Sequence, residues 1–275
     1  MAEPENNFQK PAASERPVIL AASFGTRCTE AREKTIGAVE AAIARSYPAC
    51  EVRRAFTSQT VIGIIARQDG EKIDDVTEAL ERLAACGVRE LTVQPVQFIS
   101  GFEYEGVIAA IKPYGKKFDS IKCGKPLLSS PEDYRDLTAA LGAEAKGFDD
   151  GNTAMVFMGH GTEHPANAAY ARLNNELHAA GLSRFVVGAV KAGPGLDEVI
   201  ASVKALRLKR VLLSPLMIVA GHHANNNMAG SGSGSWKSVL EAEDFDVAVN
   251  LRGLGELPGI QAMFVRHVRE AQTYG

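Results

Sequence analysis

Three histidines stand where strands are predicted to end, and imidazole nitrogens at such positions could bind a divalent metal ion. His160 lies in Gly-His-Gly-Thr directly after an apolar run, and the flanking glycines leave its imidazole uncovered. His222 and His223 follow Gly221, at the end of a second apolar run. Neutral imidazole is the commonest protein ligand for metals of this kind. We therefore expect His160 to meet at least one member of the His222–His223 pair, with the choice between the two left open.

Further reactive side chains follow neighbouring predicted strands. Lys191 comes after the run 185–190, and burial beside histidines would favour its neutral, nucleophilic amine, whereas a loop lysine would stay solvated. Cys28 comes two residues after the Gly-Thr of the first strand. It is either a nucleophile beside a histidine or an inert thiol. Glu103 and Glu105 follow Gly101 and either line the same cavity or begin a helix in solvent.

The remaining histidines fall inside predicted helices or at their starts. His178 and His267 are expected to be solvated on helix surfaces. His164 lies four residues after His160, so it either rims the same site or is also a surface residue. The chemistry is therefore expected to centre on the strand ends.

These positions require strands that end together, and the chain alternates in the way that builds such strands. Apolar, β-rich runs occupy residues 18–22, 91–96, 155–158, 185–190, 211–219 and 247–251. The intervening helical segments occupy residues 29–45, 75–85, 131–145, 164–180, 196–206 and 260–272. Buried strands alternating with amphipathic helices predict an α/β fold, with parallel sheets that are covered on both faces. Ligands of such sheets bind at the carboxyl ends of the strands.

An internal repeat predicts two similar lobes. The segment VILAASFGT, ending at Thr26, matches AMVFMGHGT, ending at Thr162. The segment RELTVQPVQFISG matches KRVLLSPLMIVAG, which places Gly101 and Gly221 in correspondence at an offset of 120 residues. Two such halves would face each other across a cleft lined by the duplicated loops.

The expected organisation is a flexible arm over residues 1–16, an N-terminal lobe over 17–150 and a C-terminal lobe over 151–275. The C-terminal helix is expected to be able to pack back on the first lobe. The arm is polar and contains no apolar leader-like run. It fits a cytoplasmic protein, or a periplasmic one if the start is the mature end of an exported chain.

Composition excludes several classes of protein. The 275 residues are 45% hydrophobic and 23% charged, which suffices for a full core. The formal charge of −3 and the scattered basic residues give no attraction to nucleic acid or to an anionic membrane, and no apolar run is long enough for a membrane span. The four cysteines form no C-x-x-C, which argues against a disulfide framework or structural zinc. The Gly-Ser run from Gly230 to Ser235 lacks the Lys-Ser/Thr of a phosphate loop, so no nucleotide is expected.

Longer motifs resemble the anaerobic cobalt chelatases, which are class II sirohydrochlorin cobaltochelatases related in fold to ferrochelatase. The resemblance runs from Val18 to Ala271 and rests on SFGT, EAREKT, RAFTSQTVI, GFEYE, KPLLSSPEDY, VFMGHGT, NAAYARL, PLMIVAGHHANNNMA and GLGELPGIQAMFVRH. It implies two similar lobes and insertion of Co²⁺ into the tetrapyrrole sirohydrochlorin without ATP. The family includes exported, oligomeric and haem-carrying members, so a homo-oligomer and bound haem are left open.

The resemblance also implies roles for single residues. His160 corresponds to a metal ligand and proton acceptor, and His223 to the second metal-binding histidine. The third ligand of the family, a glutamate, falls on Lys191, whose positive charge would repel Co²⁺. His222 stands in place of an aspartate and is a further candidate ligand. The residues expected to line the substrate cleft are Phe24, Thr26, Gln97, Phe102 and Glu103.

The departures from the family pattern gather at this site while the scaffold is intact. Gln97 replaces a histidine, Phe102 an acidic residue and Asn227 an aspartate, and Gly-Ser repeats replace an acidic loop. Our hypothesis is a chelatase with a remodelled or engineered site and impaired cobalt insertion. One alternative is a new enzyme on the same scaffold, with Lys191 as a Schiff-base amine or Cys28 paired with a histidine. The other is a non-catalytic protein that binds tetrapyrrole, haem or metal.

Overall fold

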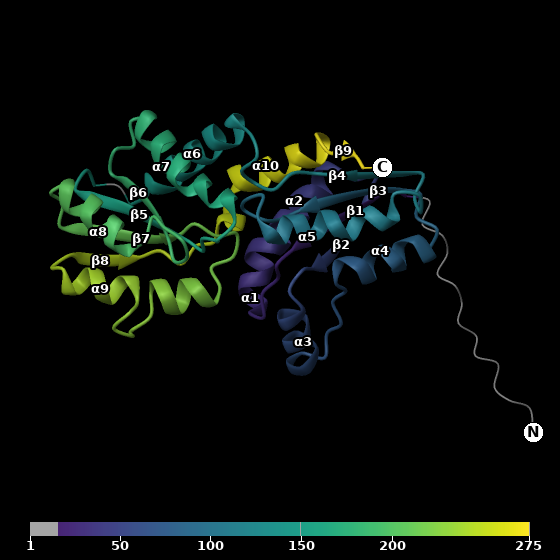
Figure 1. Ribbon diagram of the computed structural model, residues 1–275, viewed down its shortest axis with the longest axis horizontal. Coiled ribbons are helices and arrows are strands. Elements are labelled where there is room, and N and C mark those ends of the chain that lie inside the picture. Colours follow the sequence, from purple (N-terminus) through teal and green to yellow (C-terminus); the bar gives the residue numbers. More distant parts are fainter. Residues whose placement is uncertain (1–15, 149, 275) are drawn as a thin grey trace, which may run out of the picture.

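Two sheets flanked by helices form the frame of the computed structural model, which describes residues 16–148 and 150–274 (Figure 1). The first sheet has the strand order β2-β1-β3-β4-β9, and the second has the order β6-β5-β7-β8. All neighbouring strands are parallel except β9, which is antiparallel to β4. The predicted α/β class with two parallel sheets is confirmed. The expected N-terminal arm lies outside the described residues, apart from Arg16.

The elements of the first half surround β1 and β3. Its strands are β1 (Val18–Ser23), β2 (Glu51–Phe56), β3 (Glu90–Pro95) and β4 (Ser120–Cys123), joined at the edge by β9 (Gln272–Thr273). Its helices are α1 (Thr29–Arg32), a π-helical turn (Glu33–Gly37), α2 (Ala38–Ser46), α3 (Gln59–Gln68), α4 (Val76–Ala85), α5 (Phe102–Ile111) and a 3₁₀ turn (Lys112–Tyr114). Every residue of β1 is buried, as expected for a central parallel strand covered on both faces.

The second half repeats this arrangement around β5. Its strands are β5 (Thr153–Gly159), β6 (Phe185–Ala189), β7 (Arg210–Pro215) and β8 (Asp246–Val249). Its helical elements are a 3₁₀ turn (Pro165–Asn167), α7 (Ala168–Ala179), α8 (Leu196–Ala205), a π-helical turn (Ala224–Met228), α9 (Trp236–Ala242) and a 3₁₀ turn (Leu254–Glu256). The order β6-β5-β7-β8 has the same connectivity as β2-β1-β3-β4, so the repeat in the sequence corresponds to a repeat in topology.

Two helices, α6 (Pro131–Ala145) and α10 (Pro258–Arg269), join the halves. Helix α6 packs on α7 and α10, and α10 packs on α2. A single buried core includes Ile19 of β1, Phe157 of β5, Leu137 of α6 and Phe264 of α10. The expected boundary at residue 150 stays a prediction, because this core is continuous across it.

One histidine expected at the surface is buried at this junction. His267 of α10 is 2% exposed, and its Nε2 lies 2.8 Å from Oδ1 of Asp133 on α6. Arg266 contacts the same carboxylate at 2.8 Å. Burial by itself would raise the pKa of Asp133, but the hydrogen bonds from His267 and Ser130 reverse the shift and hold that pKa well below its usual range. A histidine that is hydrogen-bonded to a carboxylate can be buried on a helix face that contacts another helix, which explains why His267 is not at the surface. His178, in contrast, is exposed as expected.

Several boundaries differ from those expected. The strands β2 and β4 were not predicted, because β2 is an edge strand with polar residues and β4 is short. Strand β7 ends at Pro215 rather than at residue 219, since the carbonyls of Met217 and Ile218 accept hydrogen bonds from Leu254 and Gly255 instead. The helix expected over 29–45 contains the π-helical turn.

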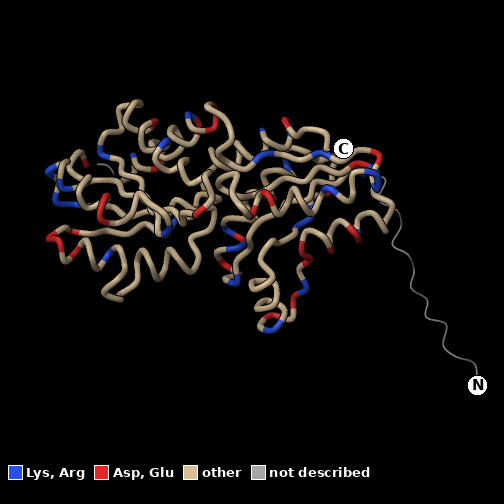
Figure 2. Tube along the Cα trace, in the orientation of Figure 1, with Lys and Arg blue, Asp and Glu red and all other residues tan. Residues whose placement is uncertain are grey.

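No helix in the described part of the chain is long and apolar enough to cross a membrane. Lys and Arg positions alternate with Asp and Glu positions over both halves, and neither sign dominates one half (Figure 2).

Candidate functional site

Two of the predicted histidines meet beyond the carboxyl ends of β5 and β7 in the second sheet. His160 follows β5 directly, and His223 precedes the π-helical turn after β7. Their ring centroids are 4.6 Å apart, with the ring planes at 72°. Nδ1 of His160 lies 3.0 Å from the carbonyl oxygen of Gly161, and Nδ1 of His223 lies 2.9 Å from Oδ1 of Asn227. Both acceptors favour a proton on Nδ1 and a lone pair on Nε2, a form that can bind a metal ion through Nε2.

The glycines around His160 are required by close packing. A Cβ atom at Gly161 would lie 1.9 Å from the backbone oxygen of Lys191, and Gly161 has a φ of +74°. A Cβ atom at Gly159 would lie 2.2 Å from the ring of Tyr170. The Tyr170 hydroxyl accepts a hydrogen bond of 3.2 Å from the Gly161 N–H. The Gly-His-Gly segment is therefore held between β6 and α7, and this fixes the position of His160.

The environment of His160 keeps its imidazole neutral. Burial is the largest influence, followed by the positive charges of His223 and Lys191, and together they lower the pKa of His160 below its usual 6.5. A hydrogen bond to Gly161 opposes this shift. At neutral pH the lone pair of Nε2 is consequently available to a metal ion or a proton.

Lys191 and Glu103 complete the group that we call the histidine site, defined as His160, His223, Lys191 and Glu103. Lys191 follows β6, and its N–H donates to the His160 carbonyl at 3.0 Å. The Lys191 side chain is exposed, so the burial on which an amine nucleophile would depend is absent. Glu103 comes from α5 in the other half. It keeps solvent contact, yet desolvation of its carboxyl group raises the pKa of Glu103, against the opposing charge of Lys191.

Contacts between α5 and the segment after β5 hold the two halves together beside this site. The ring of Phe102 packs edge-on against His164 with centroids 4.8 Å apart. Nε2 of His164 lies 3.2 Å from Oε1 of Glu105. His164 thus borders the histidine site and bridges the halves.

The aromatic residues expected in the substrate cleft are open to solvent. Phe24 is 48% exposed and Phe102 is 60% exposed, which is unusual for such large apolar side chains. In the repeat, Phe24 corresponds to His160 and Phe102 to His222. The first half therefore presents aromatic rings where the second half presents imidazoles.

Other predicted residues lie apart from the His160–His223 contact. Thr26 and Gln97 are buried, and their side chains bond the backbone of the first half. Cys28 is exposed just before α1, and within the described ranges no hydrogen bond joins it to a histidine. His222 is exposed, with its ring centroid 5.8 Å from that of His223.

The roles of Tyr170, Asn226 and Asn227 were missed from sequence. The two asparagines lie four residues after His222 and His223, respectively, a spacing that places side chains on one face of a helical turn. This four-residue spacing is the sequence feature that could have predicted the two histidine–asparagine contacts. Nothing in the sequence around Tyr170 pointed to Gly161.

The histidine site offers a metal ion two imidazole ligands, His160 and His223. Among residues 16–148 and 150–274, no group of three or more His, Cys, Asp or Glu side chains is arranged to hold a metal ion. An ion at His160 and His223 would need further ligands from water or from the molecule that receives it.

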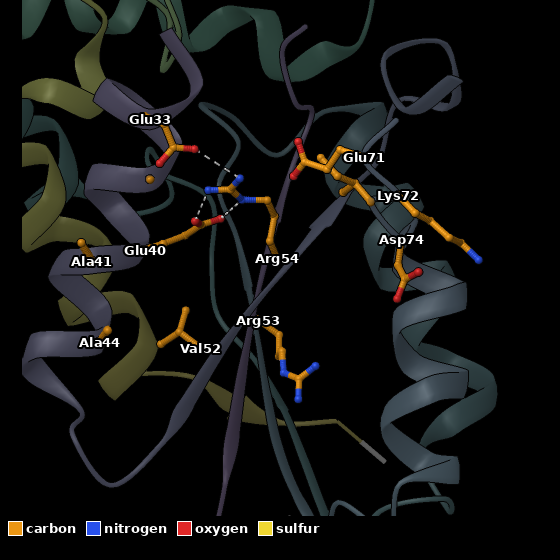
Figure 3. Close-up of a pocket in the computed structure, with 12 residues that line it drawn as sticks. Glu33, Glu40, Ala41, Ala44, Val52, Arg53, Arg54, Glu71, Lys72 and Asp74 are labelled. Atoms are coloured by element: carbon orange, nitrogen blue, oxygen red, sulfur yellow. Dashed lines mark hydrogen bonds and ion pairs between the residues drawn. The ribbon is translucent and has the colours of Figure 1, made fainter. Parts of the chain in front are cut away.

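A hollow of about 510 Å³ lies elsewhere, along the outer edge of β2 (Figure 3). Its lining is charged, and part of that charge is paired: Arg54 forms an ion pair with Glu40 at 2.6 Å and lies 3.7 Å from Glu33. No histidine or cysteine lines it. This hollow therefore offers no imidazole or thiol ligand for a metal ion.

Comparisons with known proteins show the family of the chain. The family model described as "Cobalt chelatase (CbiK)" matches residues 17–273. The sirohydrochlorin cobaltochelatase of Salmonella typhimurium is 39% identical over 258 residues, covering 93% of this chain and 96% of that protein. The sirohydrochlorin cobaltochelatase CbiKC of Nitratidesulfovibrio vulgaris is 32% identical over 260 residues, covering 92% and 89%.

Solved structures show the same fold. SirB from Bacillus subtilis with Fe³⁺ aligns with a TM-score of 0.64 at 16% identity, covering 93% of this chain and 95% of that one. CbiX, the terminal enzyme of sirohaem biosynthesis in denitrifying bacteria, aligns with a TM-score of 0.54 at 18% identity, covering 94% of this chain and 100% of that one. At such identities these matches bear on the fold alone.

Proposed function

This chain belongs to the cobalt chelatase (CbiK) family, and from that premise we propose that it inserts Co²⁺ into a tetrapyrrole of the sirohydrochlorin type at the histidine site. The observation that carries the proposal is the contact between His160, directly after β5, and His223, in the segment that follows β7, whose ring centroids are 4.6 Å apart. Paired neutral imidazoles suit a borderline divalent ion such as Co²⁺. They can hold the ion next to the macrocycle that receives it.

Insertion releases two pyrrole protons, and the site contains groups that can accept them. His160 has a lowered pKa because of burial and the neighbouring positive charges, so it is neutral and able to take a proton at neutral pH. Glu103 has a pKa raised by desolvation, which makes its carboxylate a better proton acceptor than one in water. We infer that these two residues take up the protons as the metal enters.

The aromatic residues of the first half suit a flat ligand. Phe24 and Phe102 expose large rings at positions that the repeat relates to His160 and His222. Aromatic rings stack on flat conjugated ligands and gain dispersion and hydrophobic energy there. In this proposal the macrocycle lies between the rings of the first half and the imidazoles of the second.

Lys191 is the feature that distinguishes this site chemically. It occupies the position where the family resemblance implies a metal-binding glutamate, and its charge acts on both His160 and Glu103. An ammonium group adds no ligand and repels a dication. We therefore propose that cobalt insertion is retained but slow.

The test is anaerobic incubation of the protein with sirohydrochlorin and Co²⁺, followed by the absorbance change of metallation. We expect a rate above the protein-free rate that is lost in His160→Ala and retained in His178→Ala, a matched change at an exposed histidine outside the site. If the folded protein does not accelerate metallation, the proposal is wrong.

The charge of Lys191 favours one second candidate, a protein that binds a tetrapyrrole, including haem, without metallating it. An anionic macrocycle would be attracted by the same charge that repels Co²⁺. Titration with sirohydrochlorin or haem would then shift the Soret band while no metallated product accumulates.

A further inference from the structure

His222 and His223 each contact an asparagine four residues later, Asn226 and Asn227, and the two contacts place the imidazole proton on different nitrogens. The side-chain amide nitrogen of Asn226 lies 2.9 Å from the backbone oxygen of His222 and 3.0 Å from its Nδ1. A backbone carbonyl can only accept a hydrogen bond, so the atom that faces it must be the amide nitrogen. The same NH₂ group therefore donates to Nδ1 of His222. In the neutral ring this places the proton on Nε2.

The neighbouring pair has the reverse polarity. Oδ1 of Asn227 lies 2.9 Å from Nδ1 of His223, and an amide oxygen can only accept. The proton of His223 is therefore on Nδ1, and its Nε2 carries the lone pair. His223 is also the histidine in contact with His160.

The backbone conformation of residues 224–228 places both asparagines next to their histidines. The turn Ala224–Met228 is π-helical, and the N–H of Ala229 bonds the carbonyl of Ala224. Such turns are frequent at functional sites. Asn225, the residue before the pair, bonds only backbone oxygens, those of Gly221 and Ala220 at 2.8 and 3.2 Å.

From these contacts we propose that Asn226 and Asn227 are positioning residues that divide the work between the histidines. Asn227 orients His223 as a ligand for the metal ion. Asn226 makes His222 a hydrogen-bond donor through Nε2–H, which binds a carboxylate of the macrocycle rather than the metal. This inference rests on the proposed function, and it differs from the expectation that His222 is a metal ligand.

The position of His222 fits a donor to the periphery of a ligand. Its side chain is exposed, and its ring centroid lies 5.8 Å from that of His223. The Asn226 amide donates to Nδ1 of His222, on the opposite edge of the ring from Nε2. Its Nε2–H is left to an external partner. A tetrapyrrole that carries carboxylate side chains presents such acceptors around a central metal, so a donor next to the metal ligand meets the rim of the ring.

The direct test is the imidazole tautomer, read from ¹⁵N chemical shifts of the metal-free protein under alkaline conditions. We expect Nε2–H for His222 and Nδ1–H for His223. Asn226→Asp replaces the donor by an acceptor and should switch His222 to Nδ1–H. Asn225→Asp adds the same charge one residue away and should leave both tautomers unchanged. A His222 that carries its proton on Nδ1 in the parent protein would overturn the proposal.

Binding measurements separate the two roles. Replacing His222 by alanine should weaken binding of sirohydrochlorin about tenfold, the loss of one hydrogen bond to a charged group, with Co²⁺ affinity unchanged. Replacing Asn227 by leucine should weaken Co²⁺ binding on the order of 10–100-fold, as for other residues that orient a metal ligand. Equal losses of Co²⁺ affinity in His222→Ala and His223→Ala would refute the division.

The experiments distinguish a failure of the proposed cobalt insertion from a failure of the proposed roles of His222 and His223. Tautomers and the dissociation constants of Co²⁺ and sirohydrochlorin are measured without turnover. If metallation is absent while these values behave as expected, the proposed activity fails and the division of roles stands. If the protein binds no tetrapyrrole, the role of His222 as a carboxylate donor is refuted.

Discussion

Replacing Lys191 by glutamate would test the electrostatics of the histidine site most directly. The substitution changes the charge beside His160 and Glu103 by two units and adds a carboxylate ligand. Two unit charges 4 Å apart interact by about 1 kcal/mol in water, and a dication doubles this value for each unit changed. A longer separation and screening at an exposed residue reduce the sum to about 1.4–2.8 kcal/mol, which is roughly a 10–100-fold gain in Co²⁺ affinity.

The assay combines Co²⁺ titration with the initial rate of cobalt insertion into sirohydrochlorin. Lys191→Gln separates the effects, because it removes the repulsion without supplying a ligand and should give an intermediate affinity. Lys209→Glu makes the same charge change at an exposed lysine directly before β7, at the opposite end of the strand from the histidine site, and should have little effect. If Lys191→Glu binds and inserts cobalt no better than the parent protein, the placement of Lys191 beside the bound ion is wrong.

Four further expectations concern single features of the structure. Gly161→Ala should destabilise the protein by about 1–3 kcal/mol and abolish metallation, because φ is +74° and a Cβ atom would meet the Lys191 carbonyl at 1.9 Å; denaturant unfolding checks the first effect. Phe102→Ala should raise KM for the tetrapyrrole and leave Co²⁺ affinity unchanged, since its ring is 60% exposed and carries no metal ligand. The lowered pKa of His160 keeps the imidazole neutral below pH 6.5, so the acid limb of the rate profile should lie below that of an ordinary histidine; a limb above it would contradict the role of His160. Asp133→Asn should cost about 3–5 kcal/mol of stability by leaving buried partners uncompensated. Since the folded-state pKa of Asp133 is lowered, the stabilisation is complete above its unfolded value of 3.8 and is lost as the pH falls further, which urea unfolding at acidic pH should show.

Sequence patterns predicted the central strands because these are buried on both faces and therefore continuously apolar. Strand β1 is buried along its whole length, and so is β5. The edge strand β2 escaped the same reasoning, because Glu51 and Arg53 face solvent there and interrupt the apolar pattern. His267 was misplaced for a related reason: a helix periodicity cannot show that a second helix supplies Asp133 as a buried partner.

The sequence by itself determined the fold class, the repeat and the position of His160 directly after a central strand, because these depend on local apolar runs and on the glycines that terminate them. Only the tertiary structure decided which neighbour meets His160, since adjacent side chains diverge and the π-helical turn directs His223 rather than His222 to the contact. It also brought Glu103 within range of the charge of Lys191, although the two residues come from different halves of the chain. Such long-range juxtapositions arise from the packing of α6 and α10 between the two sheets, and no local pattern encodes them.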